Sequence, residues 1–111
     1  MKTEQLILIT SIKAAADFSD SNNIFIGFDG NVCGNGAKAL GVLSANTDQD
    51  EFAPVTVLGI KLVLSGAAVS TEDKIQSDAS GKAVPFSAGE LNGYAMDDAS
   101  GADELIRIRL T

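Results

Sequence analysis

The chain has 111 residues, a net charge of −7 and a sequence pI of about 4.3, and 45% of its residues are hydrophobic. The length fits one domain, and the excess of acidic side chains argues against DNA or RNA as a partner, because nucleic-acid binding depends on Lys and Arg that neutralise phosphates. No apolar run approaches the roughly 20 residues of a membrane-spanning helix, so we expect no membrane segment.

Cys33 is the single cysteine, which excludes an intramolecular disulfide and fits synthesis in a reducing compartment such as a cytoplasm. No signal peptide is expected, because the N-terminal apolar run is short and no small-residue cleavage site follows it. A domain of this size buries roughly two-thirds of its unfolded surface. The hydrophobic fraction therefore predicts exposed apolar surface on an isolated subunit, used for oligomerisation or docking; a core of small side chains is the alternative.

Residues 1–23 differ from the rest and predict an N-terminal arm or edge strand ahead of a β domain over residues 24–111. The arm contains one apolar run, formed by Leu6, Ile7, Leu8 and Ile9. A free apolar run is costly in water, so we expect it to be covered, either by the same subunit or by a neighbour.

Short strands separated by turns follow the arm. They are expected at Asn23–Phe28, Lys38–Leu43, Ala53–Ser65, Asp73–Ser77, Lys82–Phe86, Gly93–Met96 and Glu104–Thr111. Asp29-Gly30 and Asn35-Gly36 are turn signals between them, and Pro85, which lacks an N–H, predicts a sheet edge. Counting the arm, about eight short strands and no convincing amphipathic helix predict a mainly β fold, a single small barrel or sandwich-like domain.

The longest apolar run is Ala53–Ser65, and its alternation changes phase. Val55 and Val57 share one face of an ideal strand, whereas Ile60, Leu62 and Leu64 share the other. One inserted residue near Leu58 and Gly59 would bring both sets to one side, so we predict a β-bulge there. The alternative is a central strand that is buried on both faces.

The last strand has the cleanest alternation in the sequence. Ile106, Ile108 and Leu110 are predicted to face the core, and Arg107 and Arg109 to face outward. Two exposed cations on an acidic protein suggest either contact with an acidic loop of a neighbouring subunit, such as residues 48–51, or protection of an edge strand against aggregation.

A search for reactive groups leads us to predict no catalytic, cofactor-binding or metal site. The chain has no histidine, Cys33 has no imidazole partner, and no glycine-rich loop carries a phosphate-binding Lys-Ser/Thr pair. Carboxylates cluster in two loops, one with Asp48, Asp50 and Glu51 and the other with Asp97, Asp98, Asp103 and Glu104. Solvated loops are the simplest interpretation; a Ca²⁺ site or a pair of hydrolytic carboxylates are the alternatives.

Residues 24–111 resemble the small cement or head-decoration proteins of tailed bacteriophages. The order of segments carries the resemblance: IFIGFDGNV, AKALGV, an acidic spacer, APVTVLGIKLVLSGAAVS, DKIQSDASGKAVPF and GYAMDDASGADELIRIRL. The sequence departs from the family pattern at Thr71-Glu72-Asp73, where the family often has a Gly-Asp turn.

The resemblance implies a non-enzymatic structural protein on the outer surface of the expanded capsid of a virion. It also implies a homotrimer that ties subunits of the major capsid protein together against the pressure of packaged DNA. The segment that we expect to contact the capsid is Leu6–Ile9, by adding a strand to the edge of a capsid sheet. The rival interpretations are a free-standing oligomeric β-barrel binding or adaptor module and, less in keeping with the residue types, a small hydrolase.

Overall fold

The computed structural model describes residues 2–111, which contain eight β-strands and no helix. The strands are β1 (Gln5–Lys13), β2 (Phe25–Ile26), β3 (Gly41–Leu43), β4 (Phe52–Leu64), β5 (Lys74–Ser77), β6 (Ala83–Pro85), β7 (Gly93–Ala95) and β8 (Leu105–Leu110). No helix long and apolar enough to cross a membrane occurs in residues 2–111. The mainly β class and the approximate number of strands are confirmed.

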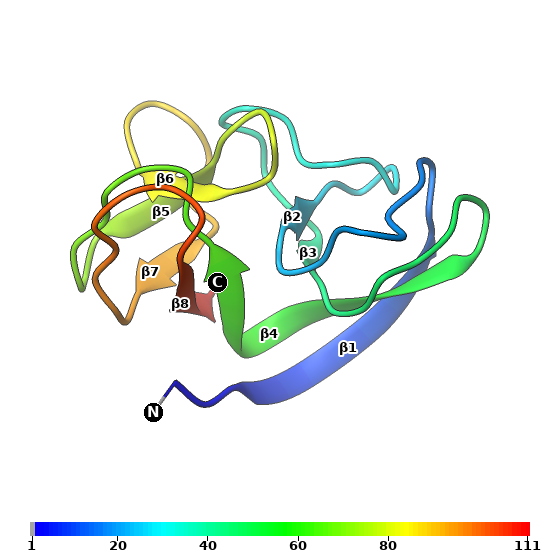
Figure 1. The fold of residues 1–111 in the computed structure, drawn as a ribbon, viewed down its shortest axis with the longest axis horizontal. Coiled ribbons are helices and arrows are strands. Elements are labelled where there is room, and N and C mark those ends of the chain that lie inside the picture. The colour runs from blue at the N-terminus through cyan, green and yellow to red at the C-terminus, as the bar shows by residue number, and fades with distance from the viewer. Residues whose placement is uncertain (1) are drawn as a thin grey trace.

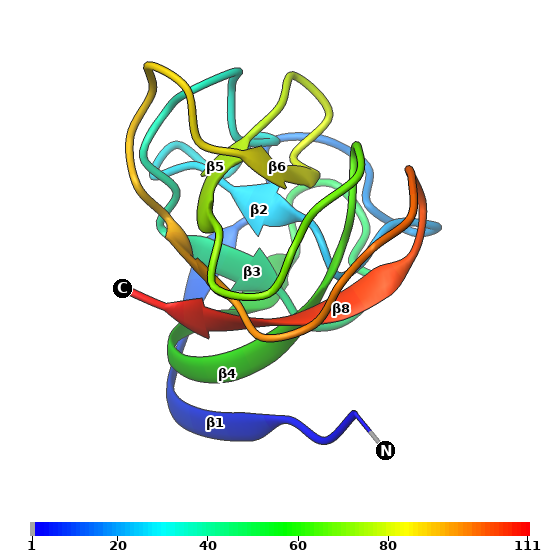
Figure 2. The same cartoon turned by 90° about the vertical axis from the view of Figure 1, so that its left-hand side faces the viewer.

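One antiparallel sheet contains all eight strands, with the order β2-β3-β4-β8-β7-β5-β6 and with β1 paired to β4 outside this path. The sheet curls into a nearly closed, barrel-like shape (Figures 1 and 2), and an isolated bridge between Ser65 and Ala83 links the end of β4 to β6. Strand β6 has only β5 beside it on the path, so Pro85 does lie at an edge.

Strand β4 organises the sheet because three strands pair with it. Both β1 and β3 pair with Val55 and Thr56, and both β1 and β8 pair with Ile60, so β1 must lie along one edge of β4 and β3 and β8 along the other. Figure 2 shows the result: β1 is the outermost strand, with β4 between it and the rest of the barrel.

Two buried clusters fill the domain. The larger one lies between β3, β5, β7 and β8 and contains Phe25, Val42, Val63, Ile75, Ile106 and Ile108 among others. The smaller one contains Ala14, Phe18, Ile24, Ile26, Leu43, Ala53 and Val55. Residues from the predicted arm segment and from the predicted β domain therefore share a core, since Ala14 and Phe18 pack with Ile24 and Val55.

The predicted irregularity in the central strand is confirmed. The register between β1 and β4 shifts on either side of the pair formed by Leu8 and Leu58, and Gly59 has a φ of 114°. Leu64 packs against the smaller cluster together with Val55, whereas Val63 belongs to the larger cluster. The predicted consequence is wrong, however: Lys61, Val63 and Ser65 are buried, whereas Ile60, Leu62 and Leu64 are only partly buried.

Two turns differ in an informative way from the sequence expectation. Phe28 was expected at the end of a strand, but β2 stops at Ile26, and Phe28 lies in the turn before Gly30, with 66% of its surface exposed. Glu72 adopts a φ of 77° in the segment where the resemblance led us to look for a glycine turn. The chain therefore makes a left-handed turn there with a residue that finds this conformation costly.

Candidate docking surface

Strand β1 is an exposed apolar ribbon. Its backbone pairs with β4 along one edge, and no strand of residues 2–111 pairs with the other edge. Eight of its nine residues are exposed, and Ile7 reaches 78% exposure. We expected this apolar run to be covered. Within the same subunit β4 pairs only with its backbone, so the side chains remain exposed and available to a partner.

The large exposed hydrophobic residues gather mainly around this ribbon. They are Leu6, Ile7, Leu8, Ile9 and Leu58 on β1 and β4, Phe52 at the start of β4, Leu105 at the start of β8, and Phe28 and Phe86 elsewhere. Only Leu6–Ile9 was anticipated from sequence. Leu58 belongs to the apolar run Ala53–Ser65, which looked like core, and its side chain is exposed at the irregular register. Phe52 precedes that run and is exposed as the first residue of β4.

A glycine allows β1 to lie close against β4. A Cβ placed on Gly59 would lie 2.3 Å from the carbonyl oxygen of Gln5 and 2.9 Å from the backbone nitrogen of Ile7. Real Cβ atoms essentially never approach a backbone atom so closely, and the φ of 114° is also one that L-residues rarely adopt. Both the close approach of β1 and the positive φ therefore require a glycine at position 59.

An ion pair also holds the start of β1 against β4. The carboxylate of Glu4 accepts hydrogen bonds from the ammonium group of Lys61 and from the backbone N–H of Leu62, the latter at 3.0 Å. Lys61 is only 4% exposed and donates a second hydrogen bond to Asn23 Oδ1 at 2.8 Å. Burial alone would raise the pKa of Glu4, but the hydrogen bonds from Lys61 and Leu62 outweigh it and lower the pKa.

The two arginines of β8 have different environments. Arg107 binds Asp97 of the same chain through Nε and Nη2, each at 3.0 Å, and this pair lowers the pKa of Asp97. Arg109 lies over the ring of Tyr94 at 5.3 Å from its centroid, and no carboxylate of residues 2–111 pairs with it. Because β8 lies between β4 and β7, the alternative that these arginines protect a free strand edge is wrong.

An open groove of about 580 Å³ adjoins the arginine that has no ion pair. Its walls come from the start of β1, the middle of β4 and the end of β8, and they include Leu6, Ile7, Leu58, Ile60, Arg109 and Leu110. The groove is mostly apolar with one cation at its margin, a composition suited to an apolar side chain that arrives beside an acidic group.

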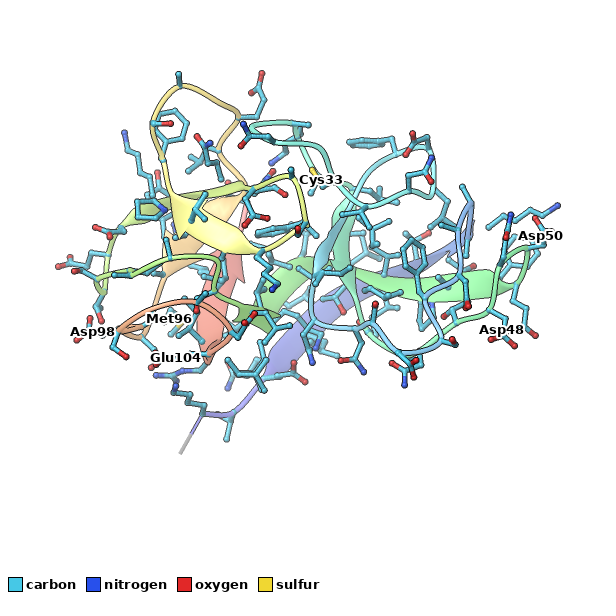
Figure 3. All side chains as sticks on the ribbon, turned by 45° about the horizontal axis from the view of Figure 1, so that its top comes forward. Cys33, Asp48, Asp50, Met96, Asp98 and Glu104 are labelled. Carbon is cyan, nitrogen blue, oxygen red and sulfur yellow. The ribbon has the colours of Figure 1, made fainter. Side chains whose placement is uncertain are left out.

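The two acidic loops lie at opposite ends of the molecule, as the labelled Asp48 and Asp50 and the labelled Asp98 and Glu104 show in Figure 3. In the second loop each carboxylate binds a different neighbour: Asp97 binds Arg107, Asp98 binds Thr71, Asp103 binds Lys82 and Glu104 binds Ser100. No group of three or more His, Cys, Asp or Glu among the described residues is arranged to hold a metal ion. These acidic side chains therefore stabilise local turns and loops.

Cys33 is a core residue. Its side chain is buried in the larger cluster and its Sγ lies 3.3 Å from the carbonyl oxygen of Ala37. Burial raises the pKa of the thiol, which disfavours the reactive thiolate.

The architecture has a relative among solved structures. The chain is similar to the N base of head fiber gp8.5 in bacteriophage phi29, with a TM-score of 0.73, 16% sequence identity, and coverage of 94% of this chain and 93% of that chain. At this identity the likeness shows a shared fold. No curated protein matches the chain.

The sequence itself matches one family model over almost its whole length. The match runs from residue 4 to residue 110, so it includes β1 and its anchor at Glu4 as well as the barrel. The segment order that suggested head-decoration proteins, the β fold with its exposed edge strand, and this match lead to one conclusion: the chain belongs to the phage cement protein family.

Proposed function

We propose that this protein binds the outer surface of the expanded phage head as a homotrimer and, without enzymatic activity, stabilises the head against internal DNA pressure. Membership of the phage cement family supports a capsid-associated structural role. The observation that carries the proposal is β1, an apolar strand whose outer edge has no partner among residues 2–111.

The outer edge of β1 is suited to a contact with the major capsid protein. Its backbone N–H and C=O groups offer hydrogen bonds to an incoming strand, and the exposed side chains of Leu6–Ile9 offer apolar contacts on either side. Strand β1 also allows approach because it contains no acidic residue, whereas the rest of a protein with a net charge of −7 repels other acidic surfaces.

In a trimer, modest contacts between each subunit and the capsid would be sufficient for tight binding to the head. Three identical arms on one trimer act as a multivalent ligand, so the second and third contacts form at high effective concentration once the first has formed. The acidic charge suits a location outside the shell, away from DNA, and a host cytoplasm remains the expected site of synthesis.

Co-sedimentation with phage heads tests this function directly. The protein is mixed with expanded, undecorated heads, and unexpanded proheads serve as the control. We expect saturable binding to expanded heads alone, with a copy number that is a multiple of three at each three-fold position. Binding to neither particle would contradict the proposal and favour a free-standing oligomeric β-barrel adaptor module.

A double substitution in β1, Leu8→Glu with Ile9→Glu, is expected to weaken binding to expanded heads by at least about tenfold, because it places carboxylates in the apolar contact. Phe86→Glu is the matched control, since Phe86 is also an exposed hydrophobic residue but follows β6, which pairs with β5 and not with β1. Equal affinities of the two variants would rule out β1 as the capsid contact. Substitution is preferable to deletion of residues 1–12, which would also remove Glu4 from Lys61.

A further inference from the structure

Opposite ends of the β1–β4 ribbon carry an apolar knob and an apolar groove. The knob is Phe52, the first residue of β4, which is 72% exposed. The groove of about 580 Å³ lies at the other end of the ribbon, around Leu6, Ile7 and Ile60. Ile60 lies eight residues after Phe52 along the strand, which corresponds to about 26 Å at the usual rise per residue. One copy of the chain therefore cannot fill its own groove.

The charges beside the knob and beside the groove are opposite. Asp48, Asp50 and Glu51 immediately precede Phe52, and neither they nor the adjacent Lys13 take part in an ion pair within residues 2–111. Arg109 lines the groove and likewise has no carboxylate partner there. Arginine is well suited to bind carboxylates in two-pronged geometry at an interface.

We propose that the occupant of the groove is a second copy of this chain, whose Phe52 enters the groove while its Glu51 meets Arg109. The inference rests on the proposed homotrimer and names the surfaces that build it. Each copy has a net charge of −7, so copies repel one another unless a cation lies in the contact, and Arg109 supplies that cation.

Knob and groove are different surfaces, so the contact is heterologous and must either close into a ring or continue as a filament. A three-membered ring satisfies every knob and every groove. The side chains of Leu6 and Ile7 would then lie at the subunit interface, which leaves Leu8, Ile9 and the outer edge of β1 available to the head.

Analytical ultracentrifugation of the full-length chain tests the knob. The wild-type protein is expected to sediment as a trimer, and Phe52→Ser to shift the midpoint of trimer formation to at least about tenfold higher protein concentration. Phe86→Ser, which removes an exposed aromatic side chain that follows β6, is expected to leave the midpoint unchanged. A wild-type protein that stays monomeric, or a trimer that Phe52→Ser leaves intact, would overturn the inference.

A charge exchange tests the partner of Arg109. Arg109→Glu and Glu51→Arg are each expected to weaken trimer formation, because each brings like charges together across the contact. The double variant restores an opposite pair in reversed orientation and is expected to assemble at lower concentration than either single variant. Purely additive weakening in the double variant would contradict the contact.

The same variants separate this inference from the function on which it rests. Wild-type trimers that depend on Phe52 but fail to bind expanded heads would refute the capsid role and leave the subunit contact intact. Saturable head binding by a protein whose assembly ignores Phe52 and Arg109 would refute the subunit contact and leave the capsid role intact.

Discussion

Gly59→Ala is expected to detach β1 from β4 and to lower the free energy of unfolding by roughly 2–4 kcal/mol. The added Cβ would lie 2.3 Å from the carbonyl oxygen of Gln5, and the backbone φ of 114° would itself be strained. Backbone atoms on the neighbouring strand cannot move aside as a flexible side chain would, so the strand pair has to open.

Urea denaturation and hydrogen exchange would measure this result. The midpoint of unfolding should fall, and the amides of Gln5–Lys13 should lose protection more than those of β8. Gly101→Ala is the matched control, because a Cβ at Gly101 has no atom within 4 Å and its φ is not in the left-handed region. Its effect should stay within about 0.5 kcal/mol. Unchanged protection of β1 in Gly59→Ala would show that the ribbon tolerates a side chain at this site.

Glu4→Gln is expected to cost roughly 2 kcal/mol, because it leaves the ammonium group of Lys61 buried with a neutral partner. Removal of one member of a fully buried ion pair costs more, about 3–5 kcal/mol. The smaller value applies because the side chain of Glu4 is 30% exposed and because Asn23 still accepts a hydrogen bond from Lys61.

The double variant Glu4→Gln with Lys61→Met distinguishes an uncompensated charge from a general loss of packing. Methionine fills a similar volume without a charge, so the double variant should be more stable than Glu4→Gln alone. Urea unfolding of the wild type, both single variants and the double variant closes the thermodynamic cycle. A double variant that is less stable than both single variants would contradict the role of the buried charge.

The pH dependence of stability follows from the same ion pair. The folded-state pKa of Glu4 is lowered, so its contribution is fully present above about pH 4.3, the usual pKa of glutamate, and is lost as the pH falls through the lower folded-state value. Arg107 lowers the pKa of Asp97, so this carboxylate also contributes stability that is lost as the pH falls. Between pH 7 and pH 3, Glu4→Gln should therefore lose less stability than the wild type.

Local sequence pattern was sufficient for the class of fold. Period-two alternation predicted that Ile106, Ile108 and Leu110 would face the core, and all three are buried. The missing N–H of Pro85 predicted a sheet edge, and the phase change near Gly59 predicted the irregular register, because both are properties of the local backbone.

The placement of individual side chains at the candidate docking surface depends on contacts far apart in the sequence. Lys61 is a charged residue within an apolar run, yet it is buried because Glu4, 57 residues away, satisfies its charge. Arg107 looked available to a neighbour, yet Asp97 holds it within the chain.

Leu58 looked like core, yet it is exposed because β1, and not a second layer of the domain, lies beside β4. Alternation along a strand tells which residues share a face. Which face is covered, and by what, is decided only when distant strands pair, because burial is a property of the assembled sheet.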